Sequence, residues 1–368
     1  MPRVIGIDPG TISIDICGLH DGQLFVDRSV PTADALADPS ILVQCLEAHA
    51  PLDLIVGPSG YGLPIKSARE LTDTDLRLAF LAAPGEAGGI GGLRSLVRAF
   101  AASTLPVVLT PGVIHLVSVP AYRKVNRVDM GTADKVCVAA LAVREYASAH
   151  RRPLRESSFI LLELGGAFTA ALAVRNGAIV DGISGSAGPM GARAAGALDG
   201  EVAYLAGVIS KRMVFEGGAA TIVGESAADP VVLFESNTPA SSLAFHAYAE
   251  SVVKAAAAAA VSLTDGRSDS SLDIVLSGRM AGVSAVRDEL TRRLAPFIGQ
   301  GEVTLLPGFA ATAKHAAQGA AILADGLAGG SSAPIVEALG LRDASGTSLD
   351  HLHVISAAAA RARLGIES

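Results

Sequence analysis

Short apolar, β-branched runs separated by turn residues open the chain. The first run, residues 4–7, ends at Asp8-Pro9-Gly10-Thr11, the second covers residues 12–19, and the third covers residues 23–29 after the turn His20-Asp21-Gly22. This pattern predicts three strands joined as a meander. A dinucleotide-binding fold would open as strand, glycine loop and helix instead, so the pattern disfavours a dehydrogenase of that class.

Helical and strand patterns then alternate. Apolar spacing predicts a helix over residues 34–49, a strand over 52–56, a helix over 92–102 and a strand over 106–110. A longer helix is expected over residues 132–150, and its apolar stripe comprises Val136, Ala140, Val143 and Ala147. Arg151-Arg152-Pro153 should end that helix, because proline cannot continue it.

A second meander follows. Strands are expected over residues 158–163, 168–175 and 178–183, with Asn176-Gly177 as the hairpin turn. Residues 191–205 should be helical in part. Beyond them the pattern predicts helices over 241–263, 283–297 and 314–327, strands over 272–276 and 303–306, a loop-rich tail over 329–346 and a last helix over 355–364.

One pattern therefore occurs twice: a three-stranded meander, glycine turns at strand ends, and helices. It predicts an α/β protein built from a duplicated unit, with a cleft between the two halves. We expect an N-terminal lobe over residues 1–131, a C-terminal lobe over 132–328 and a tail over 329–368. The helix at about 314–327 could pack back on the first lobe.

The composition narrows the function classes. Half of the 368 residues are hydrophobic and 18% are charged, which permits a large core. The formal net charge is -7, and no basic stripe is present to bind nucleic acid. Three widely spaced cysteines argue against a disulfide framework and fit a reducing compartment. Without a secretory signal or a membrane span, a cytoplasmic location is expected. The apolar excess is compatible with a homodimer.

Three turns carry the candidate chemistry. Asp8-Pro9-Gly10-Thr11 combines a strand-end carboxylate with a glycine and a hydroxyl, which suits a metal–phosphate group. Glu163-Leu164-Gly165-Gly166 repeats this logic, with Thr169 supplying the hydroxyl. Ser277-Gly278-Arg279 leads from a strand to a helix, a place that suits adenosine or phosphate. Each turn taken singly is also compatible with an ordinary β-turn or strand–helix junction.

The order of these turns resembles the phosphate-one, phosphate-two and adenosine motifs of the superfamily of actin, heat-shock chaperone ATPases, sugar kinases and acetate/butyrate kinases. The resemblance covers roughly residues 3–327 and is closest to the carboxylate-kinase branch, including its butyrate-kinase-like relatives. It implies two ribonuclease-H-like lobes with a nucleotide cleft between them. It also implies ATP and Mg²⁺ as cofactors, with Asp8 and Glu163 near the metal, in part through water. The chain departs from the family pattern where Glu163 replaces the usual Asp and Ala167 replaces the usual Ser or Thr.

A polar stretch precedes the central helix and could supply catalytic groups. Candidate general bases are Asp129 and Asp134, and candidate cations that offset transferred charge are Arg123, Lys124, Arg127 and Lys135. The same stretch also fits a solvated hinge in which Thr132 caps the helix.

The function expected from these residues is an ATP-dependent kinase of a small carboxylate or hydroxyl compound. Two alternatives stay open at this point. One is an ATP-binding regulatory or assembly protein with slow hydrolysis, and the other is the same fold used for a step of cofactor biosynthesis. We expect a small-molecule substrate, and neither nucleic acid nor a membrane as partner.

Overall fold

The computed structural model describes residues 1–57, 59–83, 92–224, 231, 234, 238–263 and 271–366. The chain forms two compact units. The first comprises Met1–Val128, Thr132–Arg155 and Pro307–Ser368, and the second comprises Asp129–Gly131 and Glu156–Leu306. Each unit contains one β-sheet.

The sheet of the first unit has the order β3-β2-β1-β4-β6-β5. The strands β1 to β3 form the predicted antiparallel meander, and β4 and β6 extend it in parallel with β1. Their bounds are β1 Arg3–Pro9, β2 Ser13–His20, β3 Gln23–Pro31, β4 Leu54–Val56, β5 Lys66–Ser67 and β6 Val107–Leu109.

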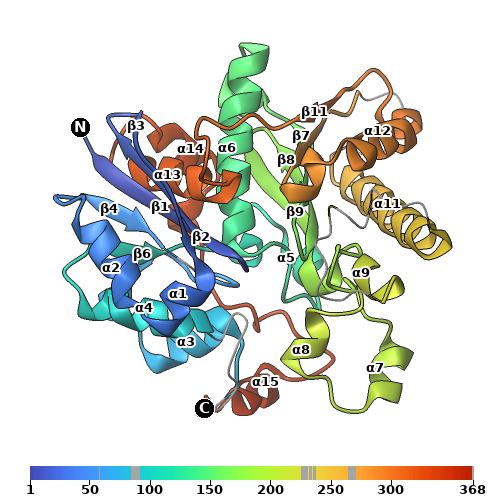
Figure 1. Cartoon of the computed structure of the whole chain (residues 1–368), viewed down its shortest axis with the longest axis horizontal. Helices are drawn as coiled ribbons and strands as arrows, with labels where there is room; N and C mark the ends of the chain where they lie inside the picture. Colours follow the sequence, from blue (N-terminus) through green and yellow to red (C-terminus); the bar gives the residue numbers. More distant parts are fainter. Residues whose placement is uncertain are drawn as a thin grey trace. The chain divides into compact units, whose positions relative to one another are not determined.

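Helices cover both faces of this sheet. The helices of the first unit are α1 Thr32–Ala37, α2 Ser40–Glu47, α3 Asp73–Phe80, α4 Leu93–Ala102, α5 Ala121–Lys124, α6 Ala133–His150, α13 His315–Leu327, α14 Ala333–Ala338 and α15 Ala357–Arg363. Ile5 and Ile7 of β1 share a core with Leu46 of α2 and Phe100 of α4. On the opposite face of β1, α13 packs against the strand, although it is remote in sequence (Figure 1).

Two sequence predictions are wrong in detail. The single helix expected over residues 34–49 is divided into α1 and α2, because Pro39 disfavours helical backbone at Asp38, which is extended. The stretch expected to be loop-rich, residues 329–346, contains α14, in which Ile335 and Val336 are buried. Buried apolar contacts therefore hold this segment in a folded structure, although its glycines and serines predict a linker.

The helices α6 and α13 touch through their backbones. A Cβ atom on Gly319 of α13 would lie 1.8 Å from the carbonyl oxygen of Cys137 in α6, so only glycine allows this approach. The contact keeps α6 in the first unit, whereas the expected lobe boundary at residue 131 assigned this helix to the second.

The sheet of the second unit has the order β11-β10-β7-β8-β9. Its meander is antiparallel, while β10 pairs in parallel with β7 and β11 pairs in parallel with β10. Apart from β5, the two sheets have the same order, as the duplicated pattern predicts. In each, the second and third strands of the meander lie on one side of its first strand, and two parallel strands lie on the other side. The strand bounds are β7 Phe159–Leu164, β8 Thr169–Arg175, β9 Ala178–Ser184, β10 Ile274–Ser277 and β11 Val303–Leu305.

The long helix α11 covers one face of this second sheet, with α12 beside it. Tyr248 and Val252 of α11 are fully buried and share a core with Ile160 and Leu162 of β7. The helices are α7 Gly200–Ala206, α8 Lys211–Val214, α9 Ala219–Ile222, α11 Pro239–Ala260 and α12 Ser284–Ile298. The helix expected within residues 191–205 begins only at Gly200, where Asp199 caps it.

Candidate functional site

Three parallel strands of the first unit end at the same edge of its sheet. Asp8 is the last residue but one of β1, and Gly57 and Thr110 directly follow β4 and β6. Buried Ser59 joins two of these ends, since its hydroxyl accepts from the backbone N–H of Thr110 (2.9 Å) and donates to the carbonyl of Gly57 (3.1 Å). The carboxyl edge of parallel strands is the usual ligand-binding edge of an α/β sheet.

Asp8 lies within electrostatic reach of the first turn of α6. Burial and the negative charge of Asp134 raise the pKa of Asp8 to about 7, although Lys314 and Lys135 act in the opposite direction. The start of α6 is fixed nearby because the N–H of Ala133 donates to the carbonyl of Gly60 (3.0 Å). The first unit therefore gathers side chains of both charges at this edge, among them Asp8, Asp134, Lys135 and Lys314.

Asp134 is held in its ionised form. Burial raises its pKa, but the charge and hydrogen bonds of Lys135, together with the hydroxyl of Thr132, outweigh burial and keep the pKa below its ordinary value. The Nζ atom of Lys135 donates to Asp134 Oδ2 (2.7 Å), and the hydroxyl of Thr132 donates to Oδ1. Thr132 therefore occupies the N-cap position without making the side-chain capping bond that the sequence suggested.

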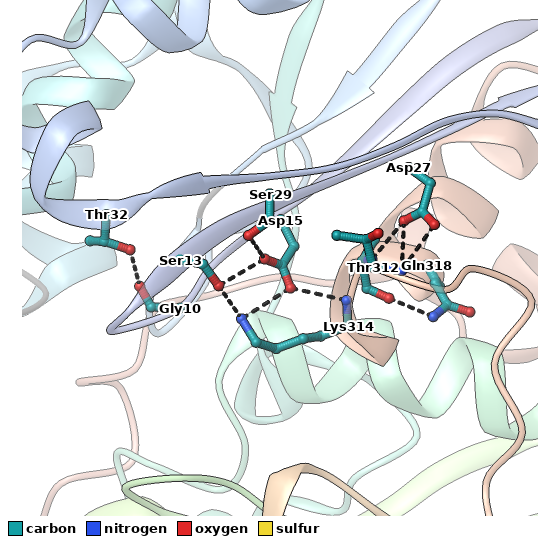
Figure 2. A network of polar contacts seen from close by, with 10 residues as sticks. Gly10, Ser13, Asp15, Asp27, Ser29, Thr32, Thr312, Lys314 and Gln318 are labelled. Atoms are coloured by element: carbon teal, nitrogen blue, oxygen red, sulfur yellow. Dashed lines mark hydrogen bonds and ion pairs between the residues drawn. The ribbon is translucent and has the colours of Figure 1, made fainter. Parts of the chain in front are cut away.

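Asp15 faces Asp8 across the first strand pair, and sequence reasoning missed it. It is almost fully buried, and its Oδ1 accepts from the hydroxyls of Ser13 and Ser29, each at 2.9 Å. Its Oδ2 lies 3.0 Å from Nζ of Lys314, which also donates to the Ser13 hydroxyl (2.7 Å), as Figure 2 shows. This network attaches Lys314, immediately before α13, to the hairpin of β2 and β3.

A second carboxylate holds the loop before α13. The Asp27 carboxylate of β3 accepts from the backbone N–H groups of Ala311 (2.8 Å), Thr312 (2.9 Å) and Ala313 (2.6 Å). Figure 2 shows Asp27 beside Thr312. Burial raises the pKa of Asp27, but these three donors outweigh burial and lower it. The backbone N–H groups of this loop are therefore already bonded to Asp27, so a ligand phosphate would have to bind elsewhere.

The glycine turn after β1 leaves little room for a side chain. A Cβ on Gly10 would lie 2.7 Å from the carbonyl oxygen of Ser13 and 3.2 Å from Nζ of Lys314. The hydroxyl of Thr32 donates to the carbonyl of Gly10 (2.7 Å) and fixes the turn (Figure 2). Thr11, the other predicted phosphate ligand of this turn, is exposed.

The polar stretch before α6 separates into parts with different surroundings. Arg127 is exposed in the first unit. Lys124 is buried, and its Nζ donates to the carbonyl of Leu116 (2.9 Å), so it has a structural partner. Asp129 belongs to the second unit, where its carboxylate packs so closely on Gly185 that a Cβ there would lie 1.7 Å from Oδ2. Of the candidate catalytic residues in this stretch, Asp134 and Lys135 are the two whose charges act on Asp8.

In the second unit, the other two motifs meet at the carboxyl edge of its sheet. Glu163 and Ser277 are neighbours across the parallel pair of β7 and β10, and both are buried. Gly278 has φ +89°, and a Cβ on it would lie 2.5 Å from the carbonyl oxygen of Leu164 and 2.7 Å from Oε1 of Glu163. The two turns are therefore in contact.

The remaining predicted residues of these two motifs differ in how accessible they are to a ligand. A Cβ on Gly166 would lie 3.7 Å from Cδ of Arg279, so the Arg279 side chain lies beside the second phosphate motif. Gly165 packs closely on the backbone of Phe168: a Cβ on Gly165 would lie 2.7 Å from the carbonyl oxygen of Phe168. Thr169 is fully buried in β8, so its hydroxyl is not accessible to a ligand.

Arg193 also lies beside the second phosphate motif and was missed from the sequence. The backbone N–H groups of Arg193 and Ala194 both donate to the carbonyl of Ala167 (3.2 Å). Nε of Arg193 is buried and has no hydrogen-bond partner within the part of the chain that the structure describes. A buried donor of this kind is available to an anion. One signal could have revealed it: Arg193 is the one charged residue between Asp181 and Asp199.

Two further findings limit the chemistry. Within the described residues, no cluster of three or more His, Cys, Asp or Glu side chains could hold a metal ion. A metal at either motif would therefore need ligand oxygens in addition to the carboxylates. The same residues include no helix with the length and apolarity needed to cross a bilayer.

Solved structures share this fold. The acetate kinase from Entamoeba histolytica matches with a TM-score of 0.59 and 12% sequence identity, over 83% of this chain and 96% of that chain. The acetate kinase from Porphyromonas gingivalis matches with a TM-score of 0.58 and 13% identity, over 87% of this chain and 98% of that chain. These likenesses confirm the two-lobed, actin-like α/β fold that the motif order implied.

Sequence comparisons place the chain in a family. No curated protein sequence matches it. The profile of the family described as "Protein of unknown function (DUF1464)" matches residues 6–354, which is nearly the whole chain. The chain therefore belongs to this family.

Proposed function

We propose that this protein is an ATP-dependent phosphotransferase that acts on a small carboxylate compound, or on a hydroxyl compound, with Mg²⁺ as its metal. The observation that carries the proposal is the repeated strand end. In each unit, the first strand of the meander ends in an acidic residue, Asp8 or Glu163, that is followed by a glycine turn at the carboxyl edge of a parallel strand pair. The fold that this chain shares with acetate kinases supports the same class of reaction.

The residues present fit the two implied cofactors. Mg²⁺ prefers oxygen ligands, keeps several waters, and commonly uses one or two carboxylates together with substrate phosphates. Asp8 and Asp134 are close enough to repel each other, a repulsion that a divalent cation would offset. Glu163 would assist through water. Gly10, Thr11, Gly165 and Gly166 would hold phosphates, and Ser277, Gly278 and Arg279 would support the adenosine.

When bound, Mg-ATP supplies an electrophilic phosphoryl group, and the protein's task is to position the acceptor and stabilise charge. Lys135 and Lys314 put positive charge beside Asp8. Arg193 suits a carboxylate acceptor because guanidinium groups bind carboxylates with two parallel hydrogen bonds. A carboxylate acceptor arrives ionised and needs no base, whereas a hydroxyl acceptor would need a general base as well.

Calorimetric titration with Mg-ATP tests the proposal first. We expect the wild-type protein to bind, and both Asp8→Asn and Gly278→Val to bind much more weakly. Asp21→Asn is the matched control, since Asp21 is exposed in the β2–β3 turn, at the end of that hairpin remote from Ser13. Equal binding by the wild type and Asp8→Asn would contradict the assignment of Asp8.

A slow ATPase is the second candidate, and one observation favours it. The second phosphate motif has Ala167 where a hydroxyl residue is usual, and its other hydroxyl, on Thr169, is fully buried. ADP release, measured with and without a panel of small carboxylates and alcohols, separates the two functions. Release that depends on an acceptor and yields one phosphorylated product per ADP supports the kinase. Slow release that no acceptor changes supports the ATPase.

A further inference from the structure

The outer face of α11, together with its C-cap residue, carries a regular row of exposed or half-exposed side chains. Leu243, Ala247, Glu250, Lys254, Ala257 and Val261 follow one another at spacings of four and three residues. This alternation repeats every seven residues and keeps all six on one side of the helix. The opposite side of α11, with Tyr248 and Val252, is fully buried against the second sheet. The row is therefore a seam of the kind that packs against another helix.

The ends of this seam are apolar and exposed. Leu243 is 61% exposed and Val261 is 73% exposed. They lie about 27 Å apart at a rise of 1.5 Å per residue. The alanines between them would let a second helix approach closely, since interaxial distance depends on the side chains at the contact.

A groove runs along the same side of α11. Its volume is about 700 Å³, and Ile183, Ala187 and Pro189 line the wall opposite the helix. The hydroxyl of Ser251 accepts from the backbone N–H of Met190 (2.6 Å) and ties that wall to α11. A standard interface buries about 800 Å² per partner, and the wall would add contact area to that of the helix alone.

The charges of the seam identify the partner. Glu250 and Lys254 are largely exposed and pair with each other along the helix (2.6 Å). If a second α11 lies antiparallel with its midpoint at residue 252, Glu250 faces Lys254 of the second copy, and Lys254 faces its Glu250. The same register puts Leu243 opposite Val261 and Ala247 opposite Ala257, each twice. A surface that complements itself in this way is the mark of a two-fold symmetric contact.

We propose that the protein forms a homodimer through antiparallel pairing of α11 with α11 of a second copy, along the groove. The proposal uses only residues of the second unit and does not depend on nucleotide binding. A helix of an unrelated protein would have to reproduce the same order of charges and apolar ends, whereas a second copy has it by symmetry.

Sedimentation equilibrium of the full chain at micromolar concentration tests this pairing. We expect twice the chain mass for the wild type. Glu250→Lys puts two lysines opposite each other twice, and Lys254→Glu does the same with two glutamates, so each should weaken the dimer about tenfold or more. The double variant Glu250→Lys/Lys254→Glu restores opposite charges across the seam and should dimerise like the wild type.

Arg212→Glu is the control, because it breaks a comparably exposed pair with the same spacing, between Arg212 of α8 and Glu216. It should leave the mass unchanged, and circular dichroism should show that every variant is folded. A monomeric wild type would overturn the proposal. So would a dimer that both single charge reversals leave intact, or a double variant that stays as weak as the single ones.

Discussion

Asp8 and Asp15 lie directly opposite each other across β1 and β2, yet their carboxylates are stabilised very differently. Asp15 accepts from two serine hydroxyls and pairs with Lys314. For Asp8, burial and the charge of Asp134 raise the pKa to about 7. Such a pair, in which one carboxyl group has a raised pKa and its neighbour has hydrogen-bond donors and a cation, is typical of sites that bind a cation or move a proton.

Asp8→Asn should therefore change the pH dependence of stability. The pKa of Asp8 is raised from 3.8 to about 7, so between these values the folded protein binds more protons than the unfolded chain. Stability then falls as pH rises through this window. Asn cannot ionise, so the stability of Asp8→Asn does not fall in this window. At pH 8 without divalent cations, the variant should therefore be more stable than the wild type by about 1–3 kcal/mol.

Urea unfolding from pH 4 to pH 8 measures this effect. The advantage of Asp8→Asn should shrink towards pH 4, where Asp8 is protonated in the folded state. Asp21→Asn, which changes an exposed turn residue, should follow the wild-type profile throughout. Parallel profiles for Asp8→Asn and the wild type would show that Asp8 has an ordinary pKa.

Lys314→Met should destabilise the protein by about 1–3 kcal/mol, because it removes a charged donor from a buried acceptor. Asp15 is only 1% exposed, and Nζ of Lys314 is 3.0 Å from its Oδ2. Asp15→Asn/Lys314→Met should recover part of the loss, since a neutral amide needs no counter-ion. Arg98→Met is the control, because its pair with Asp73 is highly exposed and should contribute less than about 1 kcal/mol. Equal losses for Lys314→Met and Arg98→Met would contradict this view of the network.

The same pair of residues shows what the sequence could and could not predict. The strands β1 to β3 and β7 to β9 follow from local patterns, because alternating apolar residues and turn residues act over a few positions. Asp15 and Lys314 are 299 positions apart, and only the packing of α13 on the first sheet brings them together. No local pattern carries that information.

Arg193 and Thr169 make the same point for the candidate site. Arg193 reaches the second phosphate motif through backbone bonds to Ala167, within a segment that has no regular secondary structure to predict. Thr169 belongs to the predicted motif, but the strand that carries it points its side chain into the core. Which face of a strand is buried depends on tertiary packing, so the motif alone could not reveal this.

Gly278→Ala should destabilise the second unit and weaken nucleotide binding together. Gly278 has φ +89°, and a Cβ would lie 2.5 Å from the carbonyl oxygen of Leu164. Strain of this kind costs about 1–3 kcal/mol. Gly282 is a close control, because it ends the short helical turn after Gly278 and a Cβ there would meet nothing within 4 Å. Gly282→Ala should leave both urea unfolding and Mg-ATP titration nearly unchanged. Equal unfolding midpoints for the two variants would show that the turn after β10 tolerates a side chain.

Arg193→Lys should separate acceptor use from nucleotide binding. The buried Nε of Arg193 and the planar guanidinium suit a carboxylate that accepts two parallel hydrogen bonds, and an ammonium group cannot reproduce this geometry. We expect kcat/KM for the acceptor to fall about 100-fold, as it does when a positioning or charge-stabilising group is lost. The Kd for Mg-ATP, measured by calorimetry, should change less than about threefold, a small fraction of the binding free energy. Arg212→Lys on α8 is the control, since Arg212 is highly exposed and pairs only with Glu216 among the bonds of the described chain. If Arg193→Lys weakened Mg-ATP binding as much as turnover, Arg193 would act on the nucleotide, and the acceptor would need a different cation.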